Sequence, residues 1–194
     1  MIGGKKCWIV LVVIAAFGMM SCEQSSLSRY HALVEKERAS SKTVNDIFFG
    51  ISLGMPNKDF YVHCWDLNKK GLFTDGPGNI SVLYKLKNNE LKHPADMNFY
   101  PTFTNGKVSS MWARFQYAGW MPYNKSLGSD SLLTDVLTLY GKWYPGGNPF
   151  MKVTNKNGSE AYIKVDGNRR ILVRRFDEKE VKVDYHDIRV ENIE

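Results

Sequence analysis

FGISLGMPNKDFYVHCWDLNKKGLF, residues 49–73, contains the clearest helix signal in the chain. Pro56 suits the first turn of a helix, where its missing N–H is no loss, and Gly71 suits the left-handed residue that ends one. The apolar residues between them recur at the spacing of one helical face: Phe60, Tyr61, Cys64, Trp65 and Leu67. The stretch therefore predicts an amphipathic helix that packs this face against a core.

A β-hairpin is predicted after this helix. Residues 99–104 and 107–117 flank Asn105-Gly106, and both turn residues tolerate the positive φ angles of a tight hairpin turn. Residues 80–86 alternate in polarity and add a strand before the hairpin. Pro101 cannot donate a backbone hydrogen bond, so we expect residues 99–104 to lie at an edge of the sheet.

The order of helix, strand and hairpin recurs in the second half of the chain. Asp130 is a good N-cap, and apolar residues follow it at helical spacing as far as Gly141. Four further runs have the pattern of strands: residues 150–154, 160–165, 169–176 and 181–187. Short turns between consecutive strands favour antiparallel pairing. The sequence therefore predicts an α+β fold, with two helices on a meandering antiparallel sheet, and suggests a tandem helix-then-hairpin repeat.

The first 22 residues have the composition of an export signal. Two lysines precede an apolar run over residues 7–20, and Ser21 and Cys22 follow it. The run has 14 residues, fewer than the roughly 20 that span a bilayer as a helix. The four residues that end at Cys22, Met-Met-Ser-Cys, resemble the lipobox of bacterial lipoproteins, in which the cysteine is lipidated and becomes the mature N-terminus.

This resemblance implies a signal peptide over residues 1–21, a lipid on Cys22 and a place in the cell envelope. Glu23 is not the aspartate associated with inner-membrane retention, so the implied location is the outer membrane, facing the periplasm or the cell surface. The alternative is ordinary secretion, with Cys22 a free thiol. Because Cys7 would leave with the signal and Cys22 would carry the lipid, Cys64 has no partner for an intramolecular disulfide.

The rest of the chain is predicted to be one domain behind a tether. Residues 22–46 are polar and rich in serine, which favours a tether over a docking helix. Residues 47–194 form the globular domain, with possible halves at 47–123 and 124–194. Hydrophobic residues make up 43% of the chain, enough for a core without disulfides. Removal of the signal lowers the formal net charge from +6 to +4. The remaining positive charge is too weakly concentrated to indicate nucleic-acid binding.

Part of the domain resembles known envelope proteins. Gly54-Met55 before a helix, followed by the hairpin over Phe103 to Val108, is similar to the SmpA/OmlA-type outer-membrane assembly lipoproteins and to β-lactamase-inhibitor-like folds. In these folds a helical segment packs on an antiparallel sheet, sometimes in tandem. The similarity covers residues 50–118, and a weaker similarity extends over residues 130–187. It implies a protein-binding adaptor at the membrane. Lys70-Gly71-Leu72 stands where the family commonly has Gly-Pro, so no partner is transferred.

The residues that could support catalysis are scattered along the chain. No zinc-binding spacing occurs among the four histidines, which are His31, His63, His93 and His186. His63 adjoins Cys64, but neighbours on a helix point about 100° apart, so they do not form a thiol–base pair. Asp184 and His186 share one face of a strand, where a solvated surface explains them. We therefore predict no catalytic residue, cofactor or metal site.

Two surface features are candidate binding sites. The first is the aromatic segment FQYAGWMPYN, residues 115–124, with Trp120, Met121 and Tyr123. Trp143 and Tyr144, which precede Pro145-Gly146, are a further candidate of the same kind. These side chains could equally fill the seam between two small cores. The second is the basic hairpin, residues 164–175, which ends in Arg174 and Arg175 and suits anionic headgroups, an acidic partner or a plain solvated face.

The sequence thus predicts a lipid-anchored envelope protein that binds another protein without catalysis. A glycan- or small-molecule-binding lipoprotein is the alternative, and it requires four exposed aromatic residues around one groove: Trp120, Tyr123, Trp143 and Tyr144. An enzyme of unrecognised type is a further alternative. The predicted partners are the membrane, through the N-terminal lipid, and an envelope protein.

Overall fold

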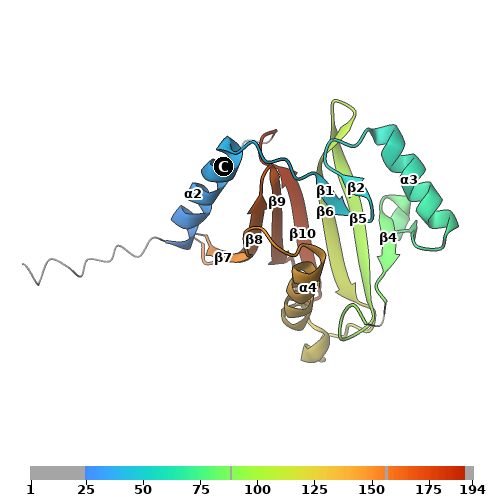
Figure 1. The fold of residues 1–194 in the computed structure, drawn as a ribbon. Coiled ribbons are helices and arrows are strands. Elements are labelled where there is room, and N and C mark those ends of the chain that lie inside the picture. Colours follow the sequence, from blue (N-terminus) through green and yellow to red (C-terminus); the bar gives the residue numbers. More distant parts are fainter. Residues whose placement is uncertain (1–24, 88, 156, 191–194) are drawn as a thin grey trace, which may run out of the picture.

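The computed structural model describes residues 25–87, 89–155 and 157–190 of the 194-residue chain. The predicted signal peptide and Cys22 lie outside these residues. Within them the fold is α+β, as predicted, with three α-helices, an eight-stranded antiparallel sheet and a small two-stranded sheet (Figure 1). The prediction of two helices is wrong, because an additional helix precedes them.

The described elements have the following bounds. The helices are α2 (Ser26–Ala39), α3 (Asn57–Lys69) and α4 (Ser129–Trp143), with 3₁₀ turns η2 (Pro77–Asn79) and η3 (Lys125–Leu127). The small sheet pairs β1 (Asp46–Phe48) with β2 (Ile51–Ser52). The strands of the large sheet are β3 (Thr74–Asp75), β4 (Val82–Lys85), β5 (Ala95–Thr104), β6 (Lys107–Tyr117), β7 (Met151–Thr154), β8 (Glu160–Asp166), β9 (Arg169–Arg175) and β10 (Glu180–Asp187). Their order across the sheet is β3-β4-β5-β6-β10-β9-β8-β7.

Each half of the chain contributes four neighbouring strands to the large sheet. α3 precedes β3 to β6, and α4 precedes β7 to β10. The last strands of the two halves meet at the centre, where Val183 of β10 lies opposite Ala113 of β6. The hairpin predicted at Asn105-Gly106 is confirmed, and both turn residues have positive φ angles, 51° and 72°.

β5 explains how a proline is tolerated in a long strand. The strand begins at Ala95, earlier than predicted, and β4 pairs with it only as far as Phe99. Pro101 lies beyond that point and pairs with Met111 of β6. Because β4 has ended, the described strands need no hydrogen bond from Pro101 on its other side. The predicted edge is therefore confirmed for this part of β5.

α3 begins and ends where the sequence predicts. Pro56 is its N-cap, and Gly71 follows it with a φ of 70°. Phe60 and Cys64 face the core, but Tyr61 and Trp65 are 49% and 61% exposed, so the predicted apolar stripe is too wide. α3 lies at one side of the sheet, near β4 and β5 (Figure 1), with its inner face on the core and the Tyr61 hydroxyl 2.9 Å from the Tyr100 hydroxyl of β5. The Nζ of Lys69 lies 3.3 Å from the Trp65 ring centroid, which covers part of this exposed indole.

α2 occupies the region predicted to be a tether. Ser25 caps it by accepting a hydrogen bond from the Ser28 N–H at 3.1 Å, and Tyr30 and Val34 face inward one turn apart. The helix packs on β7 and β8 (Figure 1). Residues from Ser25 to Ala39 are therefore a docked helix, which corrects the expectation of a tether for this part of the chain.

The two faces of the large sheet carry separate cores. The larger core lies between the sheet, α3, α4 and the β1–β2 hairpin, and its centre is aromatic: Phe48, Phe60, Phe73, Phe99, Phe115 and Tyr140. The smaller core lies under α2 and contains Tyr30, Val34, Val153, Ile163, Val165 and Ile188. α2 therefore covers the β7–β9 part of the second face.

Candidate functional site

A groove of about 1120 Å³ opens at one end of the large sheet. Its walls are the loop after β6, the β7–β8 turn and the β9–β10 turn. These segments meet because β6 and β9 end, and β8 and β10 begin, at this end of the antiparallel sheet. Three of the predicted binding residues line the groove: Trp120, Met121 and Arg175. The structure thus joins the aromatic segment to the end of the basic hairpin.

Several charged groups around the groove have partners. Arg175 Nη1 lies 2.6 Å from Asp130 Oδ1, and Lys179 Nζ lies 6.0 Å from the Trp120 ring centroid. The Asp177 carboxylate accepts two backbone N–H groups of its own turn, each at 2.8 Å. Charges of both signs therefore alternate here, so the groove is not a basic patch.

Trp143 and Tyr144 lie away from the groove. Tyr144 is 6% exposed, and its hydroxyl donates to the carbonyl oxygen of Ile47 and lies 3.1 Å from the Tyr185 hydroxyl. Trp143 is half-buried and packs against Phe48. The prediction that both belong to a binding surface is therefore wrong for Tyr144. The glycan-binding alternative required all four aromatic residues around one groove, and the burial of Tyr144 is incompatible with that arrangement.

Tyr144 belongs instead to a buried tyrosine cluster. The Tyr185 hydroxyl donates to the Tyr140 hydroxyl at 2.6 Å, and both side chains are fully buried. Burial raises the pKa of Tyr140 and Tyr185 well above the usual value for a phenol, since the charged form would have to be desolvated. All three hydroxyls therefore remain neutral and hold α4 against β10.

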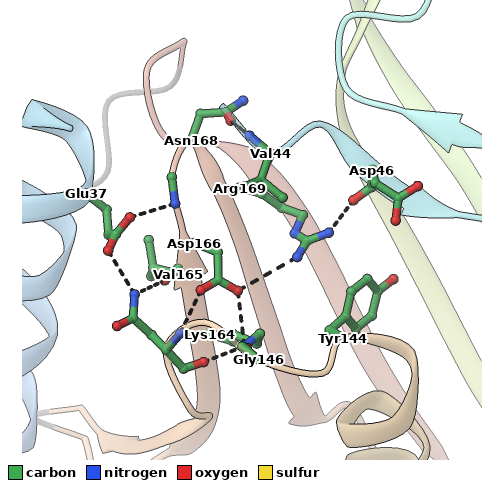
Figure 2. A network of polar contacts seen from close by, with 12 residues as sticks. Glu37, Val44, Asp46, Tyr144, Gly146, Lys164, Val165, Asp166, Asn168 and Arg169 are labelled. Carbon is green, nitrogen blue, oxygen red and sulfur yellow. Dashed lines mark hydrogen bonds and ion pairs between the residues drawn. The ribbon is translucent and has the colours of Figure 1, made fainter. Parts of the chain in front are cut away.

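The first part of the basic hairpin is buried rather than exposed. Lys164 and Arg169 are 3% and 6% exposed, and Figure 2 shows them converging on Asp166. Lys164 Nζ lies 3.0 Å and Arg169 Nη2 3.8 Å from Asp166 Oδ2. The other oxygen of Asp166 accepts the Asn148 N–H at 2.8 Å. Burying a charge is tolerable only with such partners.

This network extends to α2 through Glu37. One oxygen of the Glu37 carboxylate accepts from the Asn148 amide at 2.9 Å, and the other accepts from the Gly167 N–H at 2.7 Å (Figure 2). A Cβ added to Gly167 would lie 2.5 Å from the Lys42 carbonyl oxygen, so only glycine permits this close approach. The buried ionic network, comprising Glu37, Asn148, Lys164, Asp166 and Arg169, therefore fastens α2 and the following chain to β8 and β9.

The second face of the sheet has a solvent-accessible region over its central strands, which we call the open face. Cross-strand pairing sets Tyr100, Trp112 and Asp184 in one row, and Asn98, Arg114 and Lys182 in the next. All six are half-buried. β9 extends the second row with Arg174, opposite Lys182. The sequence patterns did not single out Trp112 and Arg114, since alternation along a strand does not show which of its faces is solvated.

The open face mixes aromatic and charged side chains. The Arg114 guanidinium lies 4.1 Å from the Phe176 ring centroid and 5.7 Å from that of Trp112. Arg114 also lies 3.5 Å from Glu180, and Lys182 lies 2.8 Å from Asp184. Arg114 Nε is buried without a hydrogen-bond partner among the described residues. This arrangement offers flat aromatic area, donors and acceptors, which is the composition of protein-binding surfaces.

The sequence candidates for catalysis have structural roles. His63 Nε2 lies 2.6 Å from the carbonyl oxygen of Phe49, and Cys64 faces the core. Asp184 forms its ion pair with Lys182. Among the described residues, no group of three or more His, Cys, Asp and Glu side chains is arranged to hold a metal ion.

Cys64 is expected to resist alkylation in the folded protein. Burial raises the pKa of its thiol from 9.0 to about 12, so the reactive thiolate is about 1000-fold scarcer than at an ordinary cysteine near pH 8. Iodoacetamide at pH 8 should leave the Cys64 peptide unmodified in native buffer and modify it in urea, as read by mass spectrometry. Rapid native labelling would contradict the burial of this face of α3.

No family model matches the chain, and no curated protein or solved structure matches it. The part of the chain that the structure describes also contains no helix with the length and hydrophobicity needed to cross a membrane.

Proposed function

We propose that this chain is a lipid-anchored protein of the cell envelope that binds another protein through the open face. The observation that carries this proposal is the placement of Tyr100 and Trp112 in one row and Arg114 in the adjacent row of the central strands. Tyrosine, tryptophan and arginine are the residues that most often dominate binding energy at protein interfaces. The site rests on β5, β6 and β10, which are rigid strands backed by the aromatic core, so little ordering is needed on binding.

The proposed location at the cell envelope is supported by the sequence before Ser25. The apolar run over residues 7–20 and the lipobox-like Met-Met-Ser-Cys support export and lipidation at Cys22. We also propose that the halves 47–123 and 124–194 are a tandem repeat. Its support is that each half has a helix followed by four antiparallel strands, with β6 and β10 at the junction.

A glycan- or small-molecule-binding role is the second candidate. The groove favours it, since Trp120 and Met121 provide apolar area and Arg175, Asp130 and Asp177 provide polar groups. The position of Tyr144 inside the core counts against the four-residue aromatic platform that this role required. The open face is therefore the better supported binding site.

Trp112→Ala is expected to weaken capture of the partner from envelope extract about 30-fold, the equivalent of about 2 kcal/mol at an interface hot spot. The bait is the full chain immobilised through a C-terminal tag. Trp65→Ala is the matched control, because Trp65 is a more exposed tryptophan on α3 and belongs to neither row of the open face.

Circular dichroism must first show that both variants are folded. A protein that is retained by wild type and Trp65→Ala but lost with Trp112→Ala would support the proposal. Equal retention by all three chains would contradict it and direct the search to ligands of the groove.

A further inference from the structure

The described chain begins at the same end of the molecule as the groove. Ser26, the first residue of α2, accepts a hydrogen bond through its Oγ from the Thr154 N–H at 3.3 Å, just before the β7–β8 turn. Residues 157–160 of that turn line the groove, together with Trp120 and Met121. The start of α2 and the aromatic segment therefore belong to one end of the fold, which we call the groove end.

The groove end carries exposed hydrophobic side chains. Tyr123 is 83% exposed and Met121 50%, and Phe176, which Arg114 partly covers, is 43% exposed. Lys125 and Lys179 lie in the same loops. Tyrosine and tryptophan beside lysine are typical of segments that lie at a membrane–water interface, where the ring enters the headgroup layer and the cation stays in water.

The docking of α2 leaves little chain between the lipid and the fold. The proposed lipid is on Cys22, and four Cα–Cα steps separate Cys22 from Ser26, which is a reach of at most about 14 Å. A free tether over residues 22–46 would let the domain move far from the bilayer. Because residues 26–39 are instead packed on the sheet, the lipid holds the groove end close to the membrane.

We infer that the groove end is a membrane-contacting surface, with Met121 and Tyr123 inserted into the headgroup layer of the bilayer that holds the lipid. This inference rests on the proposed lipid anchor. Acidic groups at this end are compensated: Asp130 pairs with Arg175, and Glu160 lies 2.7 Å from Lys152. Glu178 is exposed, so attraction to anionic lipid is weak and the contact depends on the apolar side chains. The open face then points along the membrane, accessible to a partner.

Depth-dependent quenching tests this orientation. The full chain, matured in a bacterial host and placed in phosphatidylcholine vesicles, carries the fluorophore NBD on Tyr123→Cys or, in the control, on Val190→Cys. Val190 is an exposed hydrophobic residue at the other end of the sheet, 62% exposed and near the β5–β6 turn. The buried Cys64 thiol, whose pKa is raised to about 12, contributes little labelling, and the unsubstituted chain measures that background.

Lipids with a doxyl quencher near the headgroup should remove most NBD fluorescence at position 123 and little at position 190. Equal quenching at both positions, or none at 123, overturns the inference. Mass spectrometry of the N-terminal peptide reports lipidation separately. A chain without lipid overturns the proposed anchor and the orientation with it, whereas a lipidated chain that leaves position 123 unquenched overturns the orientation alone.

Discussion

Asp166→Asn will lower the free energy of unfolding by about 3–5 kcal/mol, the cost of breaking a buried ion pair from one side. The substitution preserves the shape of the side chain but removes its charge. Lys164 and Arg169 then remain inside the fold with no carboxylate to offset their desolvation, although each keeps its bonds to backbone carbonyls. The effect is large because Lys164 and Asp166 are almost fully buried, with side chains 4% and 6% exposed.

Urea denaturation followed by circular dichroism measures this loss. The matched control is Glu160→Gln, which breaks an ion pair on the same strand between side chains that are about half exposed, Lys152 and Glu160. Exposed pairs contribute about 0–1 kcal/mol, so the control should be nearly as stable as wild type. If the two variants lost equal stability, the buried ionic network would not stabilise the fold as its geometry implies.

The elements with strong local signals were predictable from the sequence. Asn105-Gly106 located the β5–β6 hairpin because few other residue pairs adopt its φ angles, and Pro56 and Gly71 located both ends of α3. Each signal acts within a few residues of the structure it specifies. The order of strands across the sheet, with β6 beside β10, depends instead on packing between distant segments.

The basic hairpin shows why surfaces were harder to predict. The strand over residues 160–165 was predicted, but the burial of its charged residues was not: Ile163 and Val165 point to α2, while Lys164 and Asp166 point to the side of α4. A period of two separates the faces of a strand without telling which one is solvated. Because α2 covers one face of β8 and the buried ionic network occupies the other, both faces are buried.

α2 was missed because its inward face carries a weak signal. Tyr30 and Val34 are its buried apolar residues, and the next inward position holds Glu37. A carboxylate in that position normally indicates a solvated helix. Here it is stabilised by Asn148 and the Gly167 N–H, which lie more than 100 residues away in the chain. Sequence patterns of one segment contain no information about such partners.

Val34→Asp is expected to detach α2 from the sheet, with a loss of about 3 kcal/mol. Val34 is 3% exposed, and loss of its buried side chain removes about 1.5–2 kcal/mol of stabilisation. If α2 stayed docked, the buried carboxylate of the new aspartate would add a desolvation cost. The helix should therefore undock rather than bury the charge. Ala32→Asp is the control, since it places the same residue on the exposed side of the same helix.

Limited trypsin digestion distinguishes a docked helix from a tether. Trypsin cleaves after lysine and arginine in extended chain, so Lys36 and Arg38 are protected while α2 is packed. Val34→Asp should be cut there much faster than wild type, and Ala32→Asp at the wild-type rate. Equal, rapid cleavage of all three chains would mean that this region is the tether that its composition indicates. In that case the lipid would no longer hold the groove end at the membrane, because the reach from Cys22 to the fold would grow from four residues to more than 20.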